Sequence, residues 1–424
     1  MELRVMKKHS LGLFAIIGAV FGSIAACSDG SSSPFSVALI GDSPYGAAYG
    51  DTAQLKANPA FIAAVGRDTT LSMALHVGDI HSGKEFCTES FNRTIFDQWK
   101  AFTLPLVYVP GDNEWADCHK AKEGGGTYSA STGSINYVTT DGGSYAKGDP
   151  IANLALIRSI FFSTPGKTLG AAMEVRSQAV DYDRAYPSDA QFVENTWFEK
   201  NSVVFMTLNI PGGSNNDNDI WYGAPTMSDA QKQEVATRTA ANLRWIDSVF
   251  SKAMAINATA VLIQVQADMW DQDGVNKVHL TEYKQFIDKI ASNTKAFGKP
   301  VLLVNGDSHN YRSDNPLLPG SACVVEAPAP AGANGALGTA GKALACNDPA
   351  VASVAATYHA DAPGVTDPYA NQPWGYQVPN FHRLVLHTNA ATALEYLRLT
   401  VDASANAANG SDAFGPFKWA RVVP

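Results

Sequence analysis

Four apolar runs in this chain each end in the same dipeptide, Gly-Asp. They are SVALI before Gly41-Asp42, MALHV before Gly78-Asp79, LVYVP before Gly111-Asp112 and VLLVN before Gly306-Asp307. Short apolar runs of this kind are typical of strands buried on both faces of a sheet. Glycine permits a sharp turn there, and the aspartate falls at the carboxyl edge, where open α/β sheets bind ligands. If the four strands share one sheet, we expect four carboxylates to meet in one crevice.

A cluster of this kind needs compensation, because neighbouring carboxylates raise one another's pKa unless a cation is present. The alternative is that each Gly-Asp is a strand-to-helix turn with the aspartate as helix N-cap. The fourfold repetition favours a metal site. The formal net charge of −9, with only 17% charged residues and no basic block, argues against a nucleic-acid-binding surface.

The chain begins with a basic start and a short apolar stretch, which predict a signal peptide over residues 1–26. The sequence Ile-Ala-Ala-Cys27 resembles the bacterial lipobox, which implies lipid attachment at Cys27 and a membrane anchor. Ser28 after it favours the outer membrane, with the protein facing the periplasm or the cell surface. An ordinary cleaved secretory signal is the alternative. The small polar residues of 27–35 predict a flexible tether.

Four cysteines remain after Cys27, and an even number in an exported chain predicts two disulfides. Three pairings are possible. We favour Cys87–Cys118 with Cys323–Cys346, because the first pair would join the loops that follow the second and third Gly-Asp strands. Zinc binding by these cysteines is disfavoured, since no Cys-x-x-Cys pair occurs.

Strands and helices alternate along most of the chain, which predicts an α/β fold with a largely parallel sheet. Strands are expected near 36–41, 71–77, 104–109, 202–210 and 260–266, and helices over 88–102, 152–162, from Ser228 and over 281–297. Residues 119–149 have no periodicity and predict a long surface loop. Residues 313–378 predict a loop-rich insertion. Three closing strands, at 382–387, 395–401 and 417–423, are expected to pair antiparallel.

The candidate site residues follow one another in a fixed order. They are Gly-Asp42-Ser-Pro-Tyr, Gly-Asp79-Ile-His81, Gly-Asp112-Asn113-Glu114, Gln266 and Gly-Asp307-Ser-His309. This order resembles the calcineurin-like metallophosphoesterase superfamily, whose pattern is Asp-x-His, Gly-Asp, Gly-Asn-His-Asp/Glu, a strand-end His and Gly-His-x-His. The resemblance implies an α/β/β/α sandwich over 36–424, with mixed sheets and helices on the outer faces. It also implies that a metal-bound hydroxide hydrolyses a small phosphate mono- or diester.

The resemblance assigns a role to each matching position. Asp42 would ligate the first metal ion and Asp79 would bridge two ions. Asp112 takes the place of the metal-binding asparagine, and Asp307 takes that of the first histidine in the last motif. His309 matches the second histidine of that motif, a ligand of the first ion.

Three positions depart from the family pattern. Pro44 replaces a ligand histidine, Gln266 replaces the strand-end histidine, and Asn113 replaces the histidine beside the leaving group. Because oxygen donors replace nitrogen, one or two Mg²⁺, Mn²⁺ or Ca²⁺ ions are favoured over Zn²⁺, with Gln266 as a weak ligand.

Neighbouring side chains could compensate for the missing histidines. We expect Asn113 and His81 nearest the leaving group, with His81 as a general acid or an additional ligand. Glu114 is expected to orient Asn113 or a water. Tyr45 completes a Gly-Asp-x-x-Tyr sequence that resembles one in purple acid phosphatases, where it follows the second strand instead.

Two other functions fit parts of the sequence. Gly41-Asp42-Ser43 also resembles the start of GDSL serine esterases, in which Ser43 would be the nucleophile, with Asp307 and His309 as partners. A degenerate binding lipoprotein that kept the fold and lost turnover is the third reading, and the missing histidines favour it.

Overall fold

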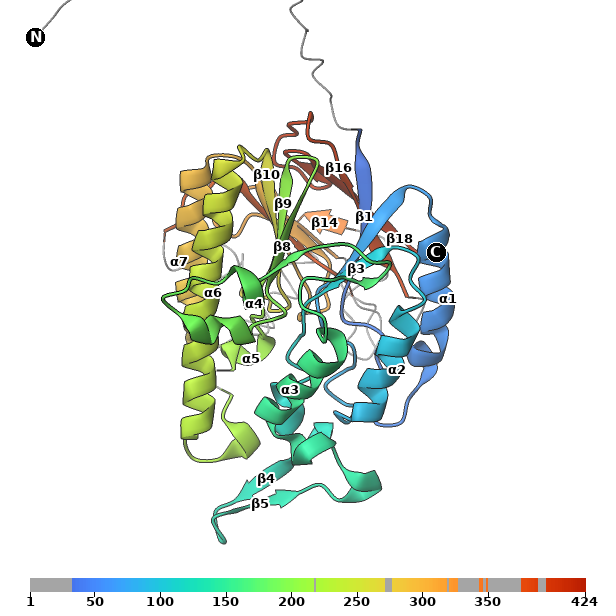
Figure 1. The fold of residues 1–424 in the computed structure, drawn as a ribbon, viewed down its shortest axis with the longest axis vertical. Helices are drawn as coiled ribbons and strands as arrows, with labels where there is room; N and C mark the ends of the chain where they lie inside the picture. Colours follow the sequence, from blue (N-terminus) through green and yellow to red (C-terminus); the bar gives the residue numbers. More distant parts are fainter. Residues whose placement is uncertain are drawn as a thin grey trace, which may run out of the picture. The chain divides into compact units, whose positions relative to one another are not determined.

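The computed structural model describes residues 33–216, 219–270, 277–318, 320–326, 343–345, 348–349, 375–387 and 394–424 (Figure 1). The predicted signal peptide, Cys27 and most of the tether lie outside these residues. So does Cys346, and with it the predicted Cys323–Cys346 pair. Within the described ranges the chain is a mixed α/β protein.

Seven strands form the first sheet, in the order β17-β18-β16-β1-β2-β3-β6. Their bounds are β1 (Phe35–Ile40), β2 (Leu71–His76), β3 (Pro105–Tyr108), β6 (Leu169–Gly170), β16 (Tyr396–Val401), β17 (Ala413–Phe414) and β18 (Phe417–Val422). Strands β1, β2 and β3 are parallel, and β16 joins β1 antiparallel. The first three Gly-Asp dipeptides therefore follow the carboxyl ends of three adjacent strands.

Nine strands form the second sheet, in the order β14-β13-β12-β15-β11-β10-β9-β8-β7. They are β7 (Arg176–Ser177), β8 (Thr196–Lys200), β9 (Val203–Thr207), β10 (Ala260–Gln264), β11 (Val301–Asn305), β12 (Arg312–Asp314), β13 (Val324–Glu326), β14 (Ala343–Ala345) and β15 (Phe381–Val385). Strands β9, β10, β11 and β15 are parallel. The fourth Gly-Asp dipeptide follows β11, so the condition that all four strands share one sheet is not met.

Helices cover the outer face of each sheet, and they lie on opposite sides of the strands in Figure 1. These helices are α1 (Ala53–Arg67), α2 (Glu89–Trp99) and α3 (Pro150–Phe161) on the first sheet and α6 (Asp229–Ala255) and α7 (Lys277–Phe297) on the second. Two four-residue helices, α4 (Gln178–Asp181) and α5 (Gly212–Asn215), lie in connections between strands of the second sheet. Helix α6 begins where its capping sequence predicts, because Ser228 Oγ accepts the backbone N–H of Gln231 at 3.1 Å. None of the helices in the described ranges is long and apolar enough to cross a bilayer.

The inner faces of the two sheets share one apolar layer. Val37 and Leu75 of the first sheet belong to the same buried cluster as Leu262 and Leu302 of the second. Two further clusters join α1, α2 and α3 to the first sheet and α6 and α7 to the second. Each central strand is therefore buried on both faces, which explains why these strands read as unbroken apolar runs.

Two parts of the chain differ from the prediction. The expected loop 119–149 contains a hairpin of β4 (Gly126–Ser129) and β5 (Ser134–Tyr137). Short 3₁₀ turns flank it, and the same turn type recurs elsewhere: η1 (Asp117–His119), η2 (Ala121–Glu123), η3 (Thr140–Gly142), η4 (Tyr145–Gly148), η5 (Pro187–Gln191) and η6 (Trp221–Gly223). Of the closing strands, β16 and β18 pair antiparallel as expected, whereas β15 joins the other sheet beside β11.

Candidate metal centre

The turns that carry the aspartates have an unusual backbone. Asp42, Asp79 and Asp307 have φ angles of 50°, 57° and 74°, and His309 has 63°. Non-glycine residues adopt this left-handed region rarely, at a cost on the order of 1 kcal/mol or more each. Such conformations cluster at functional sites, where the surrounding structure holds them.

Hydrogen bonds join the aspartates of the two sheets at their carboxyl edges. The backbone N–H of Asp307, from the second sheet, donates to Asp42 Oδ1 of the first sheet at 2.9 Å. Gln266, two residues beyond β10, donates from Nε2 to Asp112 Oδ1 at 2.8 Å. The same amide lies 3.2 Å from Asp79 Oδ2. The structure therefore brings together the four aspartates from both sheets, although the sequence argument assumed one.

Glycines make the space in which these carboxylates lie. A Cβ atom on Gly306 would stand 2.1 Å from Asp42 Oδ2, and one on Gly111 would stand 2.0 Å from Asp79 Oδ1. Neither glycine has a positive φ, so their turns do not demand glycine conformationally. The Gly-Asp pattern thus has a steric reason here: the glycine of one strand end makes room for the aspartate of another.

Burial and mutual repulsion disfavour the charged form of these groups. Burial, followed by the charges of Asp112 and Glu114, raises the pKa of Asp42 to about 7. Burial and then Asp117 raise the pKa of Asp112 to about 7. The pKa of Asp79 is raised well above its ordinary value, by burial first and then by Asp112. Either protons or a cation must therefore occupy this cluster at neutral pH.

One subset of these residues has the geometry of a cation site. Ligand atoms of Asp42, Asp79 and His309 all lie within 4.8 Å of one another. Asp42 Oδ2 is buried and has no hydrogen-bond partner in the structure. The His309 side chain is 48% exposed, which opens this side of the cluster to solvent. Two carboxylates and an imidazole, with one buried carboxylate oxygen left without a hydrogen bond, fit a divalent cation.

Tyr45 lies at the centre of the cluster, and it was not among the residues predicted to ligate metal or to act in catalysis. Its hydroxyl donates to Asp79 Oδ2 at 2.8 Å and accepts from Asn113 Nδ2 at 3.1 Å. Its oxygen lies 3.4 Å from His309 Nε2, and the two rings meet edge to face at 5.3 Å. The Gly-Asp-x-x-Tyr sequence was the signal that could have identified it.

Of the three predicted catalytic residues, only Asn113 contacts the cluster directly. Glu114 is fully buried and accepts from the hydroxyl of Tyr108 at 2.8 Å. His81 is also fully buried, packs edge to face on Phe91, and has no hydrogen-bond partner at Nε2. Burial lowers the pKa of His81 to about 4, so this ring is neutral at physiological pH.

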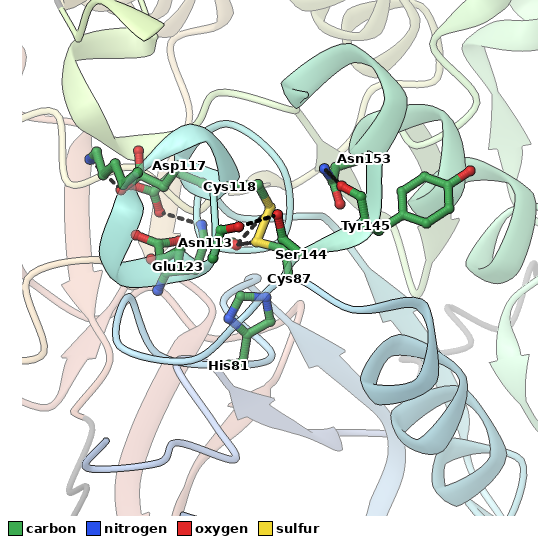
Figure 2. Close-up of a disulfide and its surroundings, with 12 residues drawn as sticks. His81, Cys87, Asn113, Asp117, Cys118, Glu123, Ser144, Tyr145 and Asn153 are labelled. Atoms are coloured by element: carbon green, nitrogen blue, oxygen red, sulfur yellow. Dashed lines mark hydrogen bonds and ion pairs between the residues drawn. A yellow bond between two sulfur atoms is a disulfide. The ribbon is translucent and has the colours of Figure 1, made fainter. Parts of the chain in front are cut away.

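A disulfide supports the Asn113 loop. Cys87 and Cys118 are bonded, which confirms this predicted pair. The carbonyl oxygen of Asn113 lies 3.2 Å from Cys87 Sγ, and Figure 2 shows Asn113 beside the disulfide. The bond therefore joins the loops after β2 and β3 directly behind Asn113.

A buried polar network supports the Asp307 turn, and no motif in the sequence analysis pointed to it. The backbone N–H of Asp268 donates to Asp307 Oδ2 at 3.0 Å, and Ser308 Oγ donates to Asp268 Oδ2 at 2.7 Å. Arg383 bonds both Asp268 and Asp314. Burial alone would raise the pKa of Asp268, but the charges of Arg383 and of the neighbouring Arg312 lower this pKa below its ordinary value. The last Gly-Asp turn is thus held by a compensated ion pair.

A second acidic group, formed by Asp117, His119 and Asp219, also has ligand atoms within 4.8 Å of one another. Lys120 Nζ already bonds Asp117 at 2.5 Å and Asp219 at 2.6 Å. His119 Nδ1 accepts the backbone N–H of Tyr222 at 2.9 Å, so the neutral ring carries its proton on Nε2. The Lys120 ammonium already binds the two carboxylates, and neither ring nitrogen of His119 has a free lone pair to bind a cation. We interpret this group as an ion-pair cluster.

The serine-esterase alternative requires a histidine beside Ser43. In the described ranges, no hydrogen bond joins the Ser43 hydroxyl to a histidine; His76 Nε2 contacts the backbone oxygen of Ser43 instead, at 3.1 Å. His309, the expected base, faces Tyr45 and Asp42.

Comparison with known proteins adds no assignment. No model of a protein family matches this sequence, and a search of curated proteins finds no match. Functional inference therefore depends on the geometry of the site and on the order of its motifs.

Proposed function

We propose that this chain is a metal-dependent phosphoesterase that hydrolyses a small phosphate mono- or diester. The observation that carries the proposal is the meeting of Asp42, Asp79, Asp112 and Asp307 where the two sheets adjoin. The first three have exposed fractions of 0%, 2% and 7%, so their charges are poorly hydrated and call for a bound cation.

The arrangement of layers supports the resemblance to calcineurin-like metallophosphoesterases. Two mixed sheets share an apolar layer, and helices cover their outer faces. Three of the aspartates follow strands of the first sheet and Asp307 follows β11 of the second, so ligands from both sheets meet. On this proposal the described residues form the family's α/β/β/α sandwich.

The residues best suited to hold the ion are Asp42, Asp79 and His309. A divalent cation bound there would supply Lewis acidity and lower the pKa of a water for attack on phosphorus. The donor set is rich in oxygen, which favours Mg²⁺, Mn²⁺ or Ca²⁺ over Zn²⁺.

Tyr45 and Lys122 contribute in different ways to a site for an anionic substrate. Burial, then the charge of Asp79, raises the pKa of Tyr45, so its hydroxyl stays protonated at neutral pH. Its single proton is donated to Asp79 Oδ2, so Tyr45 orients this carboxylate. Lys122 Nζ and Asn113 Oδ1 both lie within 3.2 Å of the position that a Cβ on Gly83 would take. Lys122 Nζ lies 3.7 Å from Oε1 of the buried Glu123, but the Lys122 side chain is 59% exposed, so its charge can still attract an anionic ester from solution.

The location of the protein follows from its predicted lipobox. We propose that it is exported and attached to the outer membrane through Cys27. The tether would then leave the site accessible to small phosphoesters outside the cytoplasm.

The direct test combines elemental analysis with an assay of hydrolysis. The purified protein is dialysed against Mg²⁺, Mn²⁺, Ca²⁺ or Zn²⁺, and its bound metal is measured. Hydrolysis of an aryl phosphate monoester and diester is then followed with and without a chelator. We expect bound metal and chelator-sensitive turnover.

Two variants separate this proposal from the serine-esterase alternative. Asp79→Asn should lose both bound metal and turnover, whereas Ser43→Ala should keep its metal and its activity. The opposite result, with labelling of Ser43 by a fluorophosphonate, would favour the serine esterase. Absence of metal under every condition would refute the metal-dependent function, and absence of turnover as well would favour a binding lipoprotein.

A further inference from the structure

The orientation of the Gln266 amide is fixed by its neighbours. Its Oε1 accepts the backbone N–H of Gly212 at 2.6 Å, and a backbone N–H can only donate. The NH₂ group must therefore face the opposite way, toward Asp112 Oδ1 at 2.8 Å and Asp79 Oδ2 at 3.2 Å. Reversing the amide would set two donors against each other and an amide oxygen against two carboxylate oxygens.

This orientation bears on how many ions the site can hold. The resemblance makes Asp79 a bridge between two ions and makes Asp112, Gln266 and Asp307 metal ligands in addition to Asp42 and His309. A ligand at Gln266 would have to present its oxygen, yet that oxygen is bonded to Gly212 and the donor hydrogens face the two carboxylates. An NH₂ group carries partial positive charge, so it occupies the side of Asp79 and Asp112 that a cation would need.

The spacing of the remaining ligands points the same way. Among the histidine, cysteine, aspartate and glutamate side chains of the described residues, no group of three with ligand atoms within 4.8 Å of one another includes Asp112 or Asp307. Part of the Asp112 charge is instead met by the backbone N–H of Asn113 at 3.1 Å. Asp307 Oδ2 is met by the backbone N–H of Asp268 at 3.0 Å.

We propose that this chain holds a single catalytic ion, at Asp42, Asp79 and His309, and that the Gln266 amide replaces the second ion. The proposal rests on the metal-dependent function inferred above. The amide links Asp79 to Asp112 by two hydrogen bonds, as a bridging cation would link them, but it supplies no Lewis acidity. Gln266 is thus a positioning residue, and the first ion alone must activate the substrate.

The test is the number of Mn²⁺ ions bound by the purified full-length protein. Equilibrium dialysis with elemental analysis should give one equivalent per chain, with the six-line electron paramagnetic resonance spectrum of an isolated Mn²⁺. Two equivalents with a spin-coupled spectrum would overturn the single-ion proposal and leave the metal-dependent function intact. No bound ion would overturn both.

A pair of matched variants tests the role of the amide. Gln266→Glu keeps an oxygen for Gly212 but replaces the NH₂ group with a second carboxylate oxygen, so bound Mn²⁺ should rise to two equivalents. Gln264→Glu makes the same exchange two residues earlier, where the amide donates to the carbonyl oxygens of His76 and Val107, at 2.7 and 3.3 Å. That control should stay at one equivalent. A Gln266→Glu protein that still binds one ion would refute the proposal that the amide excludes a second ion. If this variant fails to fold, the Mn²⁺ stoichiometry and spectrum of the wild type decide between one ion and two.

Discussion

Replacing Gly306 with alanine tests whether the glycines exist to accommodate the carboxylates. The new Cβ would stand 2.1 Å from Asp42 Oδ2 and 2.9 Å from its Cγ, far inside van der Waals contact. The nearest atoms all belong to the Asp42 side chain, and Gly306 has no positive φ, so the backbone itself tolerates alanine. The substitution should therefore displace Asp42 without unfolding the turn.

The magnitude follows from what Asp42 contributes. It is one of the three protein ligands in the candidate site, and its Oδ1 also accepts the backbone N–H of Asp307. Loss of a group that only orients a ligand weakens metal binding by roughly 10- to 100-fold. Displacing the ligand itself should cost at least as much, which corresponds to a loss of about 1.4–2.8 kcal/mol or more of binding free energy. Turnover at limiting metal should fall in parallel and recover in part at higher metal concentration.

The assay is isothermal titration calorimetry, in which the metal-free protein is titrated with Mn²⁺. Gly410→Ala is the matched control, because its Cβ would meet nothing closer than 3.4 Å and its φ is not positive either. The control should bind Mn²⁺ as the wild type does. Equal affinity in Gly306→Ala and the wild type would refute the steric explanation and the role of Asp42 as a ligand.

Three further predictions concern groups around the site and in the core. Tyr45→Phe should weaken Mn²⁺ binding roughly 10- to 100-fold, because it removes the hydrogen bond that orients the Asp79 carboxylate; Mn²⁺ affinity and kcat at saturating metal, measured together, check this. Burial lowers the pKa of His382 to about 4, so the unfolded chain alone binds this proton as pH falls from 6.5 to 4. The free energy of unfolding should fall over that window by up to about 3 kcal/mol. In His382→Gln the free energy of unfolding, measured with urea at each pH, should depend less steeply on pH. Replacing Cys87 and Cys118 by serine opens a loop of 31 residues, and thermal or urea unfolding should show a loss of about 4 kcal/mol.

Much of the architecture was predictable because it depends on local patterns. The apolar runs before Asp42, Asp79 and Asp112 form adjacent parallel strands, as their composition indicates. The start of α6 at Ser228 and the Cys87–Cys118 pair also follow from sequence. Each of these features depends on a few neighbouring residues or on chain connectivity.

The division into two sheets was not predictable from the same patterns. A strand buried on both faces looks alike whether helices or another sheet cover it, so β11 gave no sign of belonging to a second sheet. The hairpin within 119–149 was missed because β5 is only four residues long and largely exposed, so its alternation of polar and apolar residues is too short to be distinctive. Pairing partners of short exposed strands are decided by distant residues.

The chemistry of single side chains at the site was the least predictable part. Gln266 was expected to offer its oxygen to a metal, but the backbone N–H of Gly212, 54 residues away in sequence, takes that oxygen. Tyr45 was given a minor place because its motif follows the wrong strand, yet its hydroxyl contacts Asp79, Asn113 and His309. In both cases hydrogen bonds between segments far apart in the chain decide the role.

The alternative that each Gly-Asp is simply a helix cap can be weighed against three features of the site. A cap keeps its aspartate near solvent beside a helix N-terminus, whereas Asp42 and Asp79 are buried and bond residues of other turns. A cap needs no left-handed aspartate and no glycine opposite its carboxylate, but both are found here. Each feature costs folding free energy by itself. Binding of one cation, as proposed above, would offset all three together.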